Sequence, residues 1–275
     1  MDISKKILNK LEEWQKEEGT LPQYLELYRQ LLLIQIDAHE NAPSTKVALT
    51  KTEIENAMKN GISMLKWDAI PIDWAAFQKL AQAAAAIINE HSGAADKSLK
   101  KIVFDIPVLQ QMAKAWYEGS SLSPWSENLG LDEVLLSAII DCAMKPFLVA
   151  QAKNLMKALP QDSWRHGYCP VCGGKPDFAY LDKGQGARWL LCSRCDTEWL
   201  FQRLECPYCG NNQQDDLAYY TDDKELYRLY VCQRCSTYLK AIDLRHAESE
   251  TLLPLERVLT ADMDRQGQEK GYKGV

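Results

Sequence analysis

The stretch Cys169-Pro-Val-Cys172-Gly173 is the first of four Cys-x-x-Cys pairs that decide the fold of this chain of 275 residues. The other three pairs are Cys192/Cys195, Cys206/Cys209 and Cys232/Cys235. One Cys-x-x-Cys turn places two thiolates on a metal ion, and two such turns complete a tetrahedral site. Eight thiols at this spacing therefore predict two metal sites, each bound by four sulfurs.

The four pairs belong to an internal repeat. In the first copy, Cys169-Pro-Val-Cys-Gly precedes Arg188-Trp-Leu-Leu-Cys-Ser-Arg-Cys195, and in the second, Cys206-Pro-Tyr-Cys-Gly precedes Arg228-Leu-Tyr-Val-Cys-Gln-Arg-Cys235. A repeat of this kind indicates one structural unit used twice, so each copy is expected to hold its own metal ion. The alternative is an interleaved arrangement, in which the first pair joins the third and the second joins the fourth.

Short strand-like runs separate the cysteine pairs within each copy. They cover residues 178–181, 189–191, 217–220 and 226–231. Each copy is therefore predicted to be a knuckle, a hairpin and a second knuckle, which is a zinc-ribbon or rubredoxin-like module. A module of this size has little room for an apolar core, so we expect the metal to supply folding energy.

The chain before the cysteines has the periodicity of amphipathic helices. The predicted helices cover residues 3–18, 22–40, 51–60, 73–89, 107–118 and 131–159. The predicted fold class is α+β: an all-helical N-terminal domain followed by two tandem four-cysteine modules. The expected boundaries are 1–162 for the helical domain, 163–203 and 204–265 for the modules, and 266–275 for a frayed tail.

Composition and charge exclude several classes of protein. The net charge is −6, and neither the cysteine-rich half nor the remainder has the basic excess typical of a nucleic-acid binder. No apolar run approaches the roughly 18 residues of a membrane span. Nine cysteines without an apolar export signal at the N-terminus indicate metal binding in the reducing cytoplasm rather than disulfides.

Two further side chains attract attention beside the eight thiols. Cys142 lies in an apolar run, and we interpret it as a buried small side chain rather than a reactive thiol. His166 lies three residues before Cys169, but eight thiols already complete two sites, so we do not expect it to be a ligand. The sequence contains no Ser/His/Asp set, phosphate-binding glycine loop or paired carboxylates, and it predicts no enzyme.

The cysteine-rich part resembles the formate dehydrogenase accessory protein (FdhE) family. The resemblance covers about residues 164–243 and extends to motif order and linker lengths as well as cysteines. The residues that carry it are Trp164-Arg-His-Gly-Tyr-Cys169-Pro-Val-Cys-Gly-Gly-Lys-Pro176, Arg188-Trp-Leu-Leu-Cys-Ser-Arg-Cys195, Trp199, Arg203, Cys206-Pro-Tyr-Cys-Gly210 and Cys232-Gln-Arg-Cys-Ser-Thr-Tyr-Leu-Lys240.

The resemblance implies a cytoplasmic maturation factor without catalytic activity of its own. Its partner is expected to be the catalytic subunit of a molybdopterin formate dehydrogenase, and its two four-cysteine sites are expected to hold zinc or iron. Candidate contact residues for this partner flank the knuckles: Trp189, Arg203, Tyr238 and Lys240. The alternatives are a rubredoxin-like protein that passes electrons to the same partner and, third, a zinc-ribbon nucleic-acid-binding protein.

Overall fold

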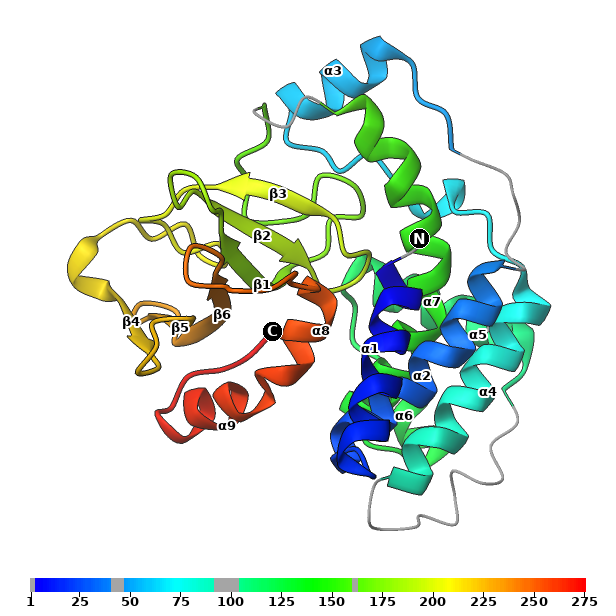
Figure 1. Cartoon of the computed structure of the whole chain (residues 1–275). Helices are drawn as coiled ribbons and strands as arrows, with labels where there is room; N and C mark the ends of the chain where they lie inside the picture. The colour runs from blue at the N-terminus through cyan, green and yellow to red at the C-terminus, as the bar shows by residue number, and fades with distance from the viewer. Residues whose placement is uncertain (1–2, 41–46, 92–103, 160–162) are drawn as a thin grey trace. The chain divides into compact units, whose positions relative to one another are not determined.

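The structure of the protein is a computed structural model, which describes residues 3–40, 47–91, 104–159 and 163–275 (Figure 1). Its contacts divide the chain into two compact units. The first unit comprises Met1–Val47 and Lys66–Gln151, and the second comprises Ala48–Leu65 and Ala152–Val275. A helical N-terminal region is thus followed by a sheet with two four-cysteine clusters, and the predicted α+β class is confirmed.

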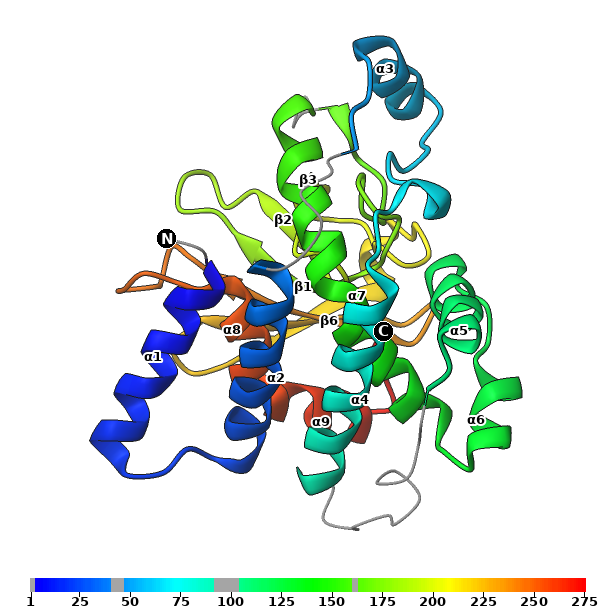
Figure 2. The same ribbon diagram turned by 90° about the vertical axis from the view of Figure 1, so that its right-hand side faces the viewer.

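The first unit is built from helices. They are α1 (Ile3–Glu18), α2 (Gln23–Glu40), η1 (Trp67–Ala69), α4 (Trp74–His91), α5 (Ile106–Glu118), α6 (Ser123–Leu129) and α7 (Glu133–Leu155), of which α7 extends past the end of the unit. Figure 2 shows α1, α2 and α4 next to one another, and α2 contacts both α1 and α4. The short helix α6 was not predicted from the sequence.

This unit has an apolar core of its own. Phe77 of α4, Met112 of α5 and Leu136 of α7 are fully buried. The rings of Phe77 and Phe147 lie 6.2 Å apart between centroids. Burial of large apolar side chains on several helices stabilises the unit without any contribution from a metal ion.

The second unit is a sheet of six strands with short helices. The strands are β1 (Pro176–Leu181), β2 (Arg188–Cys192), β3 (Glu198–Phe201), β4 (Leu217–Thr221), β5 (Tyr227–Cys232) and β6 (Thr237–Asp243). The helices are α3 (Lys51–Lys59), η3 (Met156–Ala158), η5 (Gln214–Asp216), α8 (Leu253–Leu259) and α9 (Ala261–Glu269). The strand order is β3-β2-β1-β6-β5-β4.

Each copy of the repeat contributes three antiparallel strands to this sheet. The predicted hairpins are β1 with β2 and β4 with β5, and each gains a third strand after its second knuckle, β3 or β6. The two copies meet where β1 pairs with β6 in parallel. The two modules therefore form one continuous sheet, which the separate-hairpin prediction did not include.

The strands share an apolar core with the C-terminal helices. Phe178, Ile242 and Leu253 of α8 pack in one buried cluster. Leu229 and Val231 of β5 belong to a second cluster, against which Met263 of α9 packs. The joined sheet thus buries apolar surface that a single module lacks, and metal is not its sole source of folding energy.

Residues 266–275, for which we expected a frayed tail, continue α9 and return to the sheet. The Tyr238 N–H donates to the Lys273 carbonyl at 3.1 Å, and the Lys273 N–H donates to the Ser236 carbonyl at 2.8 Å. Two main-chain hydrogen bonds to the start of β6 give this segment a fixed register. The domain boundaries after residues 162, 203 and 265 remain predictions.

Candidate metal centre

The first knuckle of each copy has the same main-chain geometry. The Gly173 N–H donates to the Cys169 carbonyl at 3.0 Å, and the Gly210 N–H donates to the Cys206 carbonyl at 2.9 Å. Gly173 and Gly210 have left-handed φ values of 73° and 69°. Such values suit glycine because it lacks a Cβ, which explains the glycine after each Cys-Pro-x-Cys.

The second knuckles also match each other. Asp196 and Ser236, each directly after the last cysteine of its copy, both have φ of 53°. Left-handed backbone at a non-glycine residue is uncommon, so its recurrence at equivalent positions supports a structural duplication. The repeat seen in the sequence therefore extends to backbone conformation.

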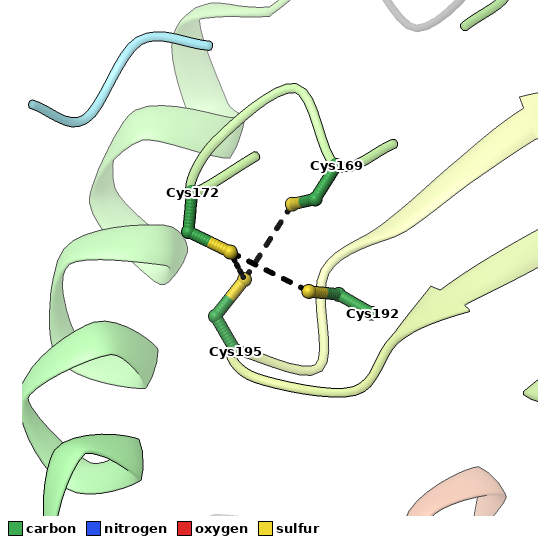
Figure 3. Close-up of side chains that lie close together, drawn as sticks. All are labelled: Cys169, Cys172, Cys192 and Cys195. Atoms are coloured by element: carbon green, nitrogen blue, oxygen red, sulfur yellow. Dashed lines mark hydrogen bonds between the residues drawn. The ribbon is translucent and has the colours of Figure 1, made fainter. Parts of the chain in front are cut away.

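The first copy brings four sulfur atoms together, as Figure 3 shows. The Sγ atom of Cys172 lies 3.5 Å from that of Cys192 and 3.4 Å from that of Cys195. The Sγ atoms of Cys169 and Cys195 are 3.6 Å apart. All four side chains are buried and point toward a common centre between the two knuckles.

The second copy forms an equivalent cluster that is more open to solvent. The Sγ atoms of Cys206 and Cys235 are 3.6 Å apart, and those of Cys209 and Cys232 are 3.7 Å apart. Cys209 is exposed and Cys235 is half-buried, whereas Cys206 and Cys232 are buried. The two clusters therefore share geometry but differ in accessibility.

Both clusters fit a tetrahedral metal ion. Zn–S bonds of about 2.3 Å in a tetrahedron place neighbouring sulfurs roughly 3.8 Å apart. The observed separations of 3.4–3.7 Å are close to this value. The cysteines gather in the linear arrangement, with one four-sulfur cluster for each copy, and the interleaved alternative is wrong. Four thiolates suit both zinc and iron.

Hydrogen-bond donors approach the sulfurs of the first cluster. The Val171 N–H donates to Cys169 Sγ and the Arg194 N–H donates to Cys192 Sγ, both at 3.4 Å. Such donors offset the negative charge of four thiolates. Burial raises the pKa of the Cys169 thiol well above its ordinary value, so an arriving cation must displace a proton there.

A helix outside the repeat holds the first cluster in place. Arg257 of α8 donates to the Cys192 carbonyl and to Asp196 Oδ1, each at 2.9 Å. Its Nε also lies 3.0 Å from Asp177 Oδ1 at the start of β1. This guanidinium therefore links the second knuckle of the first copy to β1, the strand that follows the first knuckle. The sequence pattern gave no signal for it, because Arg257 lies outside both copies.

A segment from the N-terminal half of the chain supports the first knuckle. The Met64 N–H donates to the Pro170 carbonyl at 2.9 Å, and the Leu65 N–H donates to the Val171 carbonyl at 2.8 Å. These two hydrogen bonds place Ala48–Leu65 in the same compact unit as the sheet. We had assigned this segment to the helical domain, since its helical periodicity gives no information about its tertiary partners.

The two repeat-related arginines are both buried, and Arg188 lies beside the second cluster. Arg188 donates to the carbonyls of Gln202 and Glu205, and its guanidinium lies 5.6 Å from the Tyr230 ring centroid. Burial lowers its pKa to about 10. Arg228 instead donates to Asp243 Oδ2 at 2.8 Å. The repeat showed only that the two arginines hold equivalent positions. The structure shows that each is buried and donates hydrogen bonds within the sheet unit.

The four predicted contact residues differ in accessibility. Arg203 is exposed, and Trp189 is half-buried with its ring stacked on Tyr180 at a centroid distance of 6.1 Å. Tyr238 and Lys240 are only 6% and 5% exposed. Their predicted exposure is corrected here: both bond to Asp264 of α9, at 2.8 Å and 2.6 Å, because α9 lies over this part of β6.

The two side chains interpreted as structural lie outside the clusters. The His166 ring stacks on Tyr168 at a centroid distance of 5.2 Å, and its carbonyl accepts from Trp199 Nε1. Cys142 is buried within the helical unit, and burial raises its pKa to about 12. A thiol with so high a pKa is a poor nucleophile. Among the described residues, no helix combines the length and apolarity needed to cross a membrane.

Comparison with known proteins points to one family. A family model described as "FdhE, central domain" matches residues 168–203. A protein FdhE homolog from Aquifex aeolicus is 28% identical over 230 residues, which cover 82% of this chain and 77% of that protein. The chain is similar to proteins of the FdhE family.

Further members match the chain over a shorter length. The FdhE homolog from Citrobacter koseri is 34% identical over 140 residues, which cover 49% of this chain and 42% of that protein. Protein FdhE from Escherichia coli O127:H6 is 31% identical over 129 residues, which cover 45% of this chain and 41% of that protein. These matches span less than half of either relative.

The fold is shared with a solved structure of the same family. The crystal structure of the FdhE protein from Pseudomonas aeruginosa aligns with a TM-score of 0.64 at 21% identity, over 98% of this chain and 92% of that one. At this level of identity the comparison establishes the fold alone. The fold of this chain is therefore also that of a known structure.

Proposed function

We propose that this chain binds the catalytic subunit of a molybdopterin formate dehydrogenase in the cytoplasm and is needed for that subunit to become active. Similarity to proteins of the FdhE family supports the choice of partner. The observation that carries the proposal is the pair of four-sulfur clusters. Four thiolates fill a tetrahedral site and leave no position for substrate, so the metals stabilise a binding protein rather than catalyse formate oxidation.

Co-purification with the catalytic subunit tests this function. The wild-type chain is expected to retain the subunit and to show no formate oxidation alone. The double variant Trp189→Ala/Arg203→Ala removes the two predicted contact residues that remain accessible. Tyr24→Ala/Lys16→Ala, an aromatic and a cation exposed on the helical unit, is the matched control.

Three outcomes distinguish the possible failures. Absence of any complex with wild-type chain contradicts the adaptor function. A complex that survives Trp189→Ala/Arg203→Ala contradicts only the placement of the contact surface beside the first hairpin. Formate oxidation by the isolated chain contradicts its assignment as a non-catalytic protein.

The exposure of Cys209 favours a redox role as the second candidate. A partner can approach the second cluster directly at this side chain, which the fully buried first cluster does not permit. Iron held by four thiolates has reversible redox chemistry, whereas zinc has none. An absorption spectrum of protein purified without air decides between them, because a colourless zinc protein excludes electron transfer.

A further inference from the structure

Strand β4 (Leu217–Thr221) forms one edge of the six-stranded sheet, next to β5 alone. Within the described residues, no segment pairs with its outer side. Its residues from Ala218 to Thr221 are exposed, including Tyr219 at 52% and Tyr220 at 44%. Large aromatic side chains at an open strand edge are unusual for a surface that meets only water.

The hydrogen-bond register shows which backbone groups face outward. The Gln233 N–H donates to the Asp216 carbonyl, and the Asp222 N–H donates to the Tyr227 carbonyl, one at each end of β4. Antiparallel pairs alternate between bonded and non-bonded residues, so the even-numbered residues between these ends bond to β5. The odd-numbered residues Tyr219 and Thr221 direct their N–H and C=O groups away from the sheet. Leu217 also faces outward, but its N–H already donates to the Gln214 carbonyl.

The edge lacks the features that usually prevent strand addition. The sequence Leu217-Ala-Tyr-Tyr-Thr221 contains no proline, no charged residue and no glycine. Proteins commonly place proline, lysine or a bulge on an exposed edge to stop another chain from pairing there. Strand β4 therefore offers the outward backbone groups of Tyr219 and Thr221 to an extended segment of another protein.

The side chains of β4 give such a segment an aromatic platform on each face. The Tyr219 ring lies 5.7 Å from the Tyr230 ring and 4.9 Å from the Arg228 guanidinium. On the other face, the Tyr220 ring has Lys270 Nζ 4.4 Å from its centroid. Tyr219 and Tyr220 are thus held by neighbours while half of each remains accessible to a partner.

Acidic residues flank the edge at both ends. Asp215 and Asp216 precede β4, and Asp222, Asp223 and Glu225 follow it. Lys224 is the one basic residue among positions 212–225. The negative electrostatic potential of these carboxylates attracts cationic segments and repels anionic ones. Arginine would in addition find the exposed tyrosine rings, since guanidinium groups stack on aromatic faces.

We propose that the β4 edge binds an extended, basic segment of a partner protein as an added strand. The inference deepens the proposed function and rests on it for the identity of the partner, the formate dehydrogenase catalytic subunit. Main-chain bonds to Tyr219 and Thr221 would supply affinity, and the acidic flanks and tyrosine rings would select a basic sequence.

A synthetic peptide of alternating arginine and valine tests the edge without the client subunit. Titration of the wild-type chain is followed by amide hydrogen exchange. Exchange at the outward amides of Tyr219 and Thr221 is expected to slow at least about tenfold at saturation, which corresponds to a protection of about 1.4 kcal/mol. The amides of Ala218 and Tyr220, already bonded to β5, are the internal control and should change little.

Two substitutions at one position separate backbone from side chain. Tyr219→Pro removes an outward N–H but no bond to β5, so the strand should persist. Tyr219→Val removes the same ring and keeps the N–H. Peptide binding is expected to be lost in the proline variant and weakened several-fold in the valine variant. Unchanged melting temperature and metal content in both variants show that the fold is intact.

Charge reversal in the peptide and charge removal in the protein test the electrostatic part. A glutamate–valine peptide should not bind. The variant Asp215→Asn/Asp223→Asn/Glu225→Gln should bind the arginine peptide at least about tenfold more weakly at low salt. Glu13→Gln/Glu17→Gln/Glu18→Gln, with three exposed carboxylates removed from α1, is the matched control and should bind as wild type does.

The outcomes separate this inference from the proposed function. Failure of the arginine peptide to slow exchange at residues 219 and 221, or equal binding of the glutamate peptide, overturns the edge site. Loss of the catalytic subunit on Tyr219→Pro but not on Tyr219→Val supports it. If the subunit binds wild type and Tyr219→Pro equally, the edge site is wrong while the proposed function stands. If the subunit never binds but the arginine peptide does, the proposed function is wrong while the edge site stands.

Discussion

Phe178 of β1 and Lys240 of β6 are register partners in the parallel pairing that joins the two copies of the repeat. Phe178 is fully buried, and Lys240 is 5% exposed with its Nζ 2.6 Å from Asp264 of α9. Lys240 thus contacts both the first copy of the repeat and the C-terminal helix α9. The two four-cysteine clusters therefore lie on one continuous sheet rather than on two separate modules.

The purified chain is expected to hold two metal ions, each bound by four thiolates. The reason is the pair of clusters with sulfur separations near those of a tetrahedron. Elemental analysis gives the number of ions per chain, and X-ray absorption gives the ligand type. One ion per chain, or nitrogen ligation from a residue such as His166, would contradict this prediction.

A chelator should remove the ion of the second cluster before that of the first. Cys209 is exposed and Cys235 half-buried, whereas the four cysteines of the first cluster are buried. Access of a chelator to the sulfurs is therefore easier at the second site. Release followed with a colorimetric chelator should be biphasic, and the fast phase should disappear in Cys206→Ser/Cys209→Ser. A single phase for wild type would show that the two sites exchange together.

Complete metal removal should unfold the sheet together with α8 and α9 but leave the helices of the first unit. Those helices have their own core around Phe77 and Leu136, and the C-terminal helices pack on strands that the metals hold. Far-ultraviolet circular dichroism after chelation measures the helix that remains. Loss of most helical signal would show that the two units depend on each other for stability.

The sequence predicted local features well because they depend on local chemistry. Spacing alone identified the eight cysteines that gather into two clusters, since a Cys-x-x-Cys turn is closed within a few residues. Alternating apolar residues located β1, β2, β4 and β5, and the position of Cys142 in an apolar helix indicated burial. The third strands β3 and β6 were missed because each follows its knuckle directly, without a turn signal to mark it.

Long-range partners were beyond the reach of the pattern. Nothing in either copy specifies that Phe178 lies opposite Lys240, because strand order depends on packing across the whole sheet. The role of Arg257 was likewise invisible, since its partner Asp196 is 61 positions away. Tyr238 and Lys240 were predicted to be exposed beside a knuckle, but α9 covers them, and a repeat pattern contains no information about elements outside it.

Asp243→Asn should lower stability at neutral pH and remove part of its pH dependence. Burial alone raises the pKa of the Asp243 carboxyl, but bonds from Arg245 and the charge of Arg228 outweigh it and hold the pKa below its usual value. The carboxylate therefore stabilises the fold above its unfolded pKa of about 3.9 and loses this effect as pH falls through the lower folded value.

The expected cost of Asp243→Asn at pH 7 is about 3–5 kcal/mol, because Arg228 is left buried without its charge partner. Unfolding of wild type and variant is compared by calorimetry between about pH 7 and pH 3, where the difference should shrink. Arg265→Gln, at an exposed ion pair with Glu269, is the control and should cost at most about 1 kcal/mol. A difference that does not change with pH would contradict the role of the Asp243 charge.

Replacement of Cys169 and Cys172 together by serine should abolish maturation of the formate dehydrogenase catalytic subunit, whereas Cys142→Ala should not. The double change removes half the ligands of the buried cluster and frees the knuckle to which Met64 and Leu65 bond. Cys142→Ala instead trims one sulfur from a helix core, at a cost of about 1 kcal/mol by comparison with other small truncations. Formate dehydrogenase activity in cells that carry each variant is the measurement, with cellular protein levels as the control.

A Cys142→Ala protein that folds and accumulates normally yet fails to support activity would show that this thiol has a chemical role. Full activity of the double cysteine variant would show that the first metal site is not needed for maturation of the catalytic subunit.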